Sequence, residues 1–208
     1  MRRSTATAAL ILLTVAVSLV VTLGGGDGYA ASMRAGFIPA RLSGIETDYL
    51  AVPALLTPLS CTLLHAGLLH LAMNMLMLGF TGRETERAVG PWGVLVLYVV
   101  GAYAAAFAQW LPDPQSVTPM IGASGAASAV VGAYSLLFGR SRAQAIGPIP
   151  AQVVHVAWLA VAWTVVNLMI AYAFLGAGVA VAAAAHIGGF FAGLALARPL
   201  LMWRWRRA

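Results

Sequence analysis

Charge is scarce in this sequence, and lysine is absent. Only 9% of the 208 residues are charged, all 12 basic residues are arginine, and 61% of the residues are hydrophobic. Together with a mean hydropathy of +0.88, this composition excludes a soluble globular domain and is typical of a polytopic membrane protein. The net charge of +6 does not indicate a nucleic-acid partner, because the arginines lie mostly at the ends of apolar runs.

Cysteine and intramembrane acidic residues are also nearly or wholly missing. Cys61 is the only cysteine, so an intrachain disulfide is excluded, and no recognisable motif places a base beside this thiol. No aspartate or glutamate lies within a predicted span, which excludes a Ser-His-Asp triad inside the membrane. The sequence also lacks the internal repeats that transporters often carry.

Apolar runs long enough to cross a bilayer, roughly 20 residues each, follow one another along the chain. We predict an all-α membrane protein with one integral domain over residues 1–208, a bundle of six transmembrane helices. The predicted spans are 6–23, 61–80, 91–110, 122–139, 153–174 and 178–200. A short charged turn, 82–87, joins the second span to the third.

The first run and the loop after it need separate interpretation. Residues 6–23 are either part of a signal peptide cleaved after Ala31 or a retained first helix. We predict a retained helix, because the run is long for a signal peptide and just sufficient to span the bilayer. The loop 24–58 contains several apolar residues, so we expect it to lie in or on the membrane interface.

The arginines predict the orientation. With the N-terminus inside, ten arginines fall on the cytoplasmic side and two, Arg34 and Arg41, on the outer side. Positive charge concentrates on the cytoplasmic side of membrane proteins. We therefore predict a multi-pass protein of the cell membrane with both termini in the cytoplasm, and with the loop 24–58 outside.

A serine between glycines stands where a proline-rich loop meets the fourth predicted span, in the sequence Gly122-Ala123-Ser124-Gly125. Glycine allows another backbone to approach closely, and a helix N-terminus offers free N–H groups and partial positive charge to an oxyanion. Taken alone, Ser124 is more simply a helix-packing residue whose hydroxyl binds its own backbone. Its polar companions in other spans favour a nucleophile instead.

Those companions are His65, His70 and Asn74 on the second span and His186 on the sixth. Polar groups inside a bilayer are costly and usually face a bundle interior or a cavity. His70 and Asn74 are four residues apart and share a helix face, at a depth comparable to that of Ser124. For any one of these residues, an interhelical hydrogen bond is the simpler explanation.

Two faces of small residues favour contact between the fourth and sixth spans. They consist of Gly125, Ala129 and Gly132, and of Gly189 and Gly193 following His186. Such faces allow close backbone approach, which would bring His186 within hydrogen-bond reach of Ser124. The pair would be a dyad in which packing, and no carboxylate, orients the imidazole.

The motifs His65-x4-His70-x3-Asn74, Gly122-Ala123-Ser124-Gly125 and Ala185-His186-x2-Gly189-x3-Gly193 resemble the signatures of the rhomboid intramembrane serine proteases. Their order and membrane side match as well, and the resemblance covers residues 55–200. It implies Ser124 as nucleophile and His186 as general base. It further implies an oxyanion hole lined by His70, Asn74 and Gly122, with His65 supporting the first loop.

The resemblance also implies the partners. Family members cut transmembrane protein substrates near the outer face of the lipid bilayer, with neither metal nor cofactor, and no oligomer is required to complete the site. Two other functions stay open at this stage. One is a catalytically silent relative that binds transmembrane clients, although such relatives usually lack the serine or the histidine. The other is a small transporter or channel that uses the intramembrane histidines as a proton or metal path.

The chain departs from the family at several positions. The first loop lacks a Trp-Arg pair, for which Arg41 or Arg34 would have to substitute, and Val181 stands where glycine is frequent. His155 matches no motif, and we interpret it as an interfacial residue. Ser128 replaces the aromatic residue that often follows the nucleophile by one turn.

Ser128 has two interpretations. It either hydrogen-bonds His186 directly, or binds the carbonyl of Ser124 along its own helix while a ring from elsewhere and packing near Gly189 hold His186. We expect the second, because a serine on a membrane helix finds that carbonyl with little loss of entropy.

Overall fold

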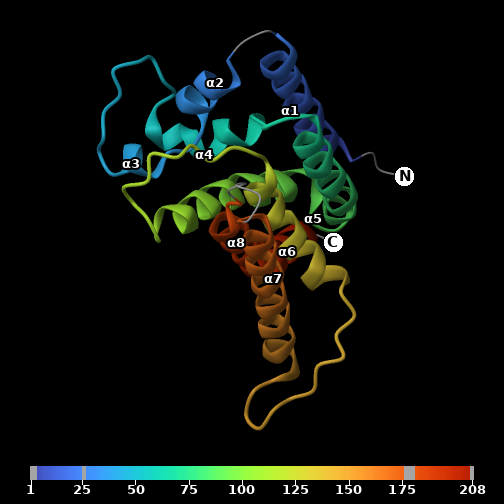
Figure 1. Ribbon diagram of the computed structural model, residues 1–208. Coiled ribbons are helices and arrows are strands. Elements are labelled where there is room, and N and C mark those ends of the chain that lie inside the picture. The colour runs from blue at the N-terminus through green and yellow to red at the C-terminus, as the bar shows by residue number, and fades with distance from the viewer. Residues whose placement is uncertain (1–3, 25–26, 176–180, 207–208) are drawn as a thin grey trace.

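The computed structural model describes residues 4–24, 27–175 and 181–206. Its long helices are α1 (Thr5–Leu23), α5 (Leu68–Trp110), α6 (Ser124–Phe138), α7 (Ala151–Leu175) and α8 (Ala183–Trp205) (Figure 1). In these residues the β-structure is limited to two isolated bridges, so the predicted all-α class is confirmed. Residues 178–180 of the sixth predicted span, and Arg2, Arg3 and Arg207, lie outside the described residues.

The predicted count of six spans is not confirmed. Within the described residues, four helices are long and apolar enough to cross a membrane: α1, α5, α7 and α8. α5 runs for 43 residues and covers both the second and the third predicted span. α6 has 15 residues, fewer than the ~20 that a straight span needs.

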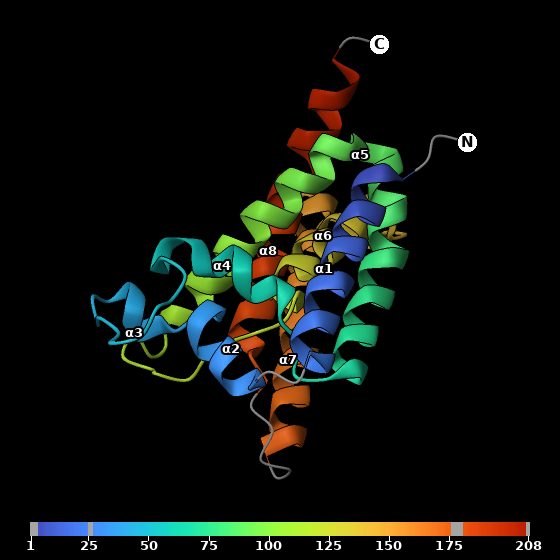
Figure 2. The same cartoon turned by 90° about the horizontal axis from the view of Figure 1, so that it is seen from above.

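A bend in α5 replaces the predicted turn at 82–87, which is helical in the structure. Gly90 has φ +82°, which glycine adopts without strain, and Pro91 follows it without a backbone N–H. α5 therefore consists of two arms that meet at Gly90, and Figure 2 shows the sharp change of direction between them. Glu86, in the first arm, is buried at 4% exposure.

The second predicted span begins too early. Residues 61–63 form the 3-10 helix η2 (Cys61–Leu63), and α5 starts only at Leu68, so His65 lies ahead of the helix instead of on it. The chain leaves helical geometry at Leu64, which is extended, and Gly67, with φ +158°, is the last non-helical residue before α5.

The predicted loop 24–58 contains regular structure. Its elements are α2 (Gly28–Ala35), α3 (Pro39–Leu42), the 3-10 helix η1 (Ala54–Leu56) and the beginning of α4 (Thr57–Ser60). Phe37, fully buried, pairs with Met120 through two backbone hydrogen bonds. Arg41 donates from Nη2 to the carbonyl of Val52 at 2.6 Å. The segment is thereby fastened to the loop that leads to Ser124.

α6 lies at the centre of the bundle and packs against both α5 and α8. The glycines on the α6–α8 boundary leave no space for a side chain: a Cβ on Gly189 would meet the carbonyl oxygen of Gly125, and one on Gly193 that of Ala129. The predicted close approach of the small-residue faces is therefore present. α7 packs chiefly against α8.

Candidate active site

The loop before α6 determines how Ser124 is presented. The N–H of Gly122 donates to the carbonyl of Cys61 at 2.9 Å, and Gly122 has φ +118°. This positive φ is strained for any residue with a side chain. α6 begins at Ser124 without a side-chain cap. The first N–H groups of the helix, which have no partner within it, are thus available beside the hydroxyl.

Ser124 and His186 lie in direct contact. Ser124 Oγ is 2.8 Å from Nε2 of His186, although 62 positions separate the two residues in the chain. Both side chains are half-buried. The close packing of α6 and α8 at Gly125 and Gly189 explains how two backbones bring these side chains together.

The other nitrogen of the imidazole has a partner that sequence reasoning missed. Nδ1 of His186 is 2.8 Å from Oδ1 of Asn167 on α7. Asn167 is buried at 4% exposure, and its Nδ2 donates to the carbonyl of Trp163 at 2.9 Å. The available signal was an isolated amide in an apolar span, which indicates a side chain facing the bundle interior but does not identify its partner.

Trp163 holds the backbone of the same histidine. Its indole Nε1 donates to the carbonyl of His186 at 3.2 Å. The indole also stacks on Phe190, one turn after His186, with ring centroids 4.7 Å apart and 9° between planes. Trp163 thus contacts the backbone of His186 and the ring of Phe190, and a ring packed on the imidazole itself stays a prediction.

His70 lies over Gly122. A Cβ placed on Gly122 would stand 2.9 Å from Nε2 of His70 and 3.7 Å from Oγ of Ser124. Nδ1 of His70 accepts from the N–H of Ala66 at 3.3 Å, so the ring proton is on Nε2, which is a donor directed at this place. Asn74 is buried, and its Nδ2 donates to the carbonyl of His70 at 2.9 Å.

His65 connects the loop before Ser124 to the first helix. Its Nε2 accepts from the N–H of Ala123 at 3.3 Å, and its Nδ1 lies 2.9 Å from Oγ of Ser18 on α1. Ser18 in turn donates to the carbonyl of Leu63 at 2.8 Å. Ser18 is a second residue that sequence reasoning missed, because a hydroxyl on an apolar helix is unremarkable without its partner.

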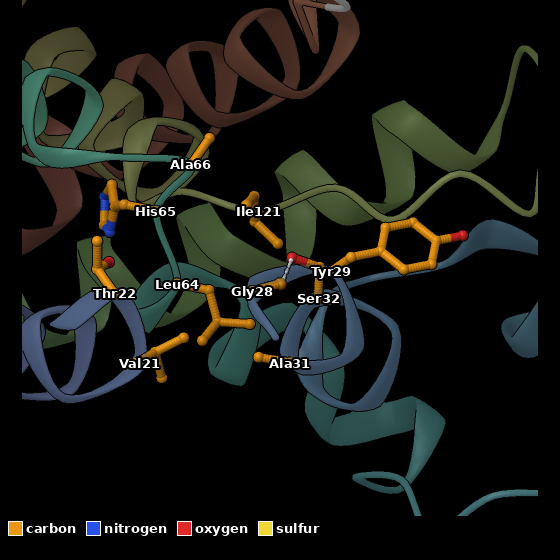
Figure 3. A pocket seen from close by; sticks show the side chains of 10 residues that line it. All are labelled: Val21, Thr22, Gly28, Tyr29, Ala31, Ser32, Leu64, His65, Ala66 and Ile121. Atoms are coloured by element: carbon orange, nitrogen blue, oxygen red, sulfur yellow. Dashed lines mark hydrogen bonds between the residues drawn. The ribbon is translucent and has the colours of Figure 1, made fainter. Parts of the chain in front are cut away.

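A cavity of about 380 Å³ opens beside His65. It lies between α1 and α2, and Figure 3 shows the lining side chains around it. Its lining residues include Thr22, Tyr29, Leu64 and Ile121. Because Ile121 directly precedes Gly122, the cavity reaches the loop that presents Ser124.

The structure also locates Ser128, His155 and Cys61, the other positions considered in the sequence analysis. Ser128 donates to the carbonyl of Ser124 at 2.7 Å, as expected for the second interpretation. His155 lies half-buried near the start of α7. Burial raises the pKa of the Cys61 thiol to about 12, which keeps it protonated and unreactive. Among the described residues, no group of three His, Cys, Asp or Glu side chains is placed to hold a metal ion.

Comparisons with known proteins match the chain to a single family. The family model of the Rhomboid domain matches residues 54–203. "RHOMBOID-like protein 5" of Arabidopsis thaliana is 30% identical over 144 residues, 69% of this chain and 43% of its own length. "Rhomboid protease GluP" of Bacillus subtilis is 30% identical over 145 residues, 70% of this chain and 26% of its own.

A third relative extends the match. "Rhomboid protease GlpG" of Pectobacterium atrosepticum is 31% identical over 170 residues, 77% of this chain and 57% of that protein. The chain thus spans less than two thirds of the length of each of these curated relatives.

Proposed function

Because this chain belongs to the rhomboid family, we propose that it is an intramembrane serine endopeptidase that cleaves transmembrane protein substrates. The observation that carries the proposal is the 2.8 Å contact between Ser124 Oγ and His186 Nε2 at the start of a helix. A nucleophile within hydrogen-bond reach of a base is the geometry of covalent catalysis. The chain is a multi-pass membrane protein, so its substrates are proposed to lie in the same bilayer.

The reaction follows from the placement of these groups. Ser124 Oγ attacks the carbonyl carbon of the scissile bond while its proton passes to Nε2 of His186. The C–N bond then breaks, the leaving amine takes that proton, and an acyl-enzyme is formed. Water, deprotonated by His186, attacks the ester carbon, and Ser124 recovers its proton as the carboxylic acid product leaves.

The oxyanion hole is proposed to combine several donors. The free N–H groups at the start of α6 and the Nε2–H of His70 are directed at the region beside Ser124 and Gly122. Asn74 contributes once its Nδ2 leaves the carbonyl of His70. Removing one such donor typically reduces kcat about 100- to 1000-fold.

The membrane arrangement is part of the proposal. The two arms of α5 are proposed to be separate spans that meet at Gly90 near the cytoplasmic surface, and α6 is proposed to be a short span, which gives six. Both termini then lie in the cytoplasm of a cell-membrane protein, and Ser124 acts near the outer face. The arginine distribution supports this orientation.

A fluorophosphonate serine probe and a model transmembrane substrate, both applied in proteoliposomes, test the proposal. The wild type and the control Ser135→Ala, on the same helix, are expected to react with the probe and cleave the substrate. Ser124→Ala is expected to do neither, and His186→Ala to lose at least about 1000-fold in cleavage rate. Full labelling of folded Ser124→Ala would contradict the proposal. A wild type that binds the substrate without cleaving it would favour a catalytically silent, client-binding protein.

A further inference from the structure

Asn167 is the buried polar residue of α7 that contacts the candidate base. It is 4% exposed on a helix whose neighbouring residues are largely apolar, and its amide is bonded at both ends. A buried amide that loses a hydrogen-bond partner is destabilising, because nothing then compensates for its removal from water. The hydrogen bonds to Trp163 and His186 therefore compensate for burying the Asn167 amide among apolar residues.

The hydrogen bonds fix the direction of the amide. A carbonyl oxygen accepts only from an N–H or O–H group, so the group facing the carbonyl of Trp163 is Nδ2 and the group facing His186 is Oδ1. An amide oxygen is an acceptor, so Nδ1 of His186 carries the ring proton. In a neutral imidazole, Nε2 then holds the lone pair, and Nε2 is the atom 2.8 Å from Ser124 Oγ.

From this geometry we propose that Asn167 is a positioning residue that holds His186 in the Nδ1–H tautomer with Nε2 directed at Ser124. The inference rests on the proposed function and adds a third member, from α7, to what the sequence predicts as a dyad. A neutral amide suits this place, because a carboxylate paired with imidazolium would have to be desolvated in the membrane.

The surroundings of His186 allow this role to be measured. Ser124 faces it from α6 and Asn167 from α7, both uncharged, and His70 on α5 is the titratable group that would repel a protonated His186 if it were itself protonated. Trp163 anchors the backbone of His186 through an independent hydrogen bond. A change confined to the Asn167 side chain therefore alters the orientation of the ring and leaves its backbone attached.

The first test compares Asn167→Leu with the control Thr164→Val. Thr164 lies one turn earlier on α7 and, like Asn167, binds the carbonyl four positions before it, whereas the side-chain partner of His186 on α7 is Asn167. Asn167→Leu is expected to lower kcat roughly 100-fold with KM within about twofold, as expected for an interaction made in the transition state. Thr164→Val is expected to keep wild-type kcat. Wild-type kcat in folded Asn167→Leu would overturn the inference.

The second test uses Asn167→Asp and a pH profile. A carboxylate at this position keeps the acceptor and favours the imidazolium, so the acid limb of kcat/KM is expected to move to higher pH. An acid limb unchanged from the wild type would contradict contact with the base. The wild type itself gives a third readout: ¹⁵N spectra are expected to show His186 protonated on Nδ1 at rest, and protonation on Nε2 would overturn the inference.

The serine probe distinguishes failure of the proposed function from failure of the inference about Asn167. If the serine probe labels the wild type and Ser124→Ala alike, Ser124 is not the nucleophile, and the proposed function fails whatever the tautomer of His186. If the probe requires Ser124 but is indifferent to Asn167, only the inference fails.

Discussion

At the scale of single residues, Gly122 has little freedom to change. Its φ of +118° disfavours any side chain, and a Cβ would stand 2.8 Å from Cε1 of His70. We expect Gly122→Ala to displace His70 or Ser124 and to reduce cleavage more than about 10-fold, since small misplacements of reacting groups are costly. Gly28→Ala, where a Cβ meets nothing within 4 Å, is the matched control. Equal cleavage rates for the two variants would refute the assigned role of Gly122.

Ser128 gives the opposite prediction. Its hydroxyl binds the carbonyl of Ser124 along the helix, so we expect it to take no part in the proposed reaction. Ser128→Ala is expected to change kcat/KM by less than about 5-fold, under ~1 kcal/mol of barrier. A loss beyond about 100-fold in the folded variant, measured on the same substrate, would make Ser128 a member of the catalytic group.

Residues within motifs were predictable, and isolated residues were not. Ser124, His186 and His70 have neighbours along the chain whose spacing indicates a helix face or a helix start, so their types and positions carry information. Asn167 and Ser18 have no such neighbours. Their meaning lies in a partner on another helix, and the sequence does not say which partner that is.

At the scale of elements, Glu86 joins α5 to the start of α1. Its carboxylate accepts from the backbone N–H groups of Ala6 and Thr7 at 3.1 and 2.8 Å and from the Thr7 hydroxyl at 2.7 Å. The first N–H groups of a helix lack partners within it and attract negative charge. Glu86 therefore caps α1 from a different helix.

Removing this cap should detach the start of α1. Hydrogen bonds to charged groups contribute about 1.5–3 kcal/mol, so Glu86→Ala is expected to destabilise the protein by about that amount. The control is Glu84→Ala, two positions before Glu86 on the same helix. It removes only a partly exposed ion pair with Arg87, and such a pair contributes at most ~1 kcal/mol. Thermal unfolding in detergent measures the Tm of both variants. A Tm for Glu86→Ala no lower than that of Glu84→Ala would argue against the cap.

The elements themselves were predictable in type and less so at their boundaries. The apolar runs and their length predict α1 and α7 to within two residues at each end, whereas α8 (Ala183–Trp205) begins and ends five positions later than the predicted span 178–200. They did not predict that the charged segment 82–87 is helical, because buried Glu86 finds its partners on α1, a contact that local sequence does not express. Likewise, Gly67 separates His65 from α5 through a backbone angle that the sequence pattern does not contain.

At the scale of the whole molecule, orientation is the property to measure. Cys61 is the only cysteine of the chain, so Cys61→Ala gives a cysteine-free background. Single cysteines can then be introduced at Gln115 and Ser141, which are both exposed. An impermeant maleimide applied to intact cells is expected to label Gln115→Cys and to leave Ser141→Cys unlabelled, because α6 lies between the two positions. The reverse pattern would place Ser124 on the cytoplasmic side and refute the proposed topology.

The order of the three contacting residues along the chain has a consequence for biosynthesis. Ser124 lies in α6, Asn167 in α7 and His186 in α8, the last helix described. Under the proposed mechanism, a nascent chain leaving the ribosome would carry its nucleophile well before the histidine that activates it. Until α8 has been translated and has packed against α6, the growing polypeptide would then be unable to cleave the other membrane proteins being inserted around it.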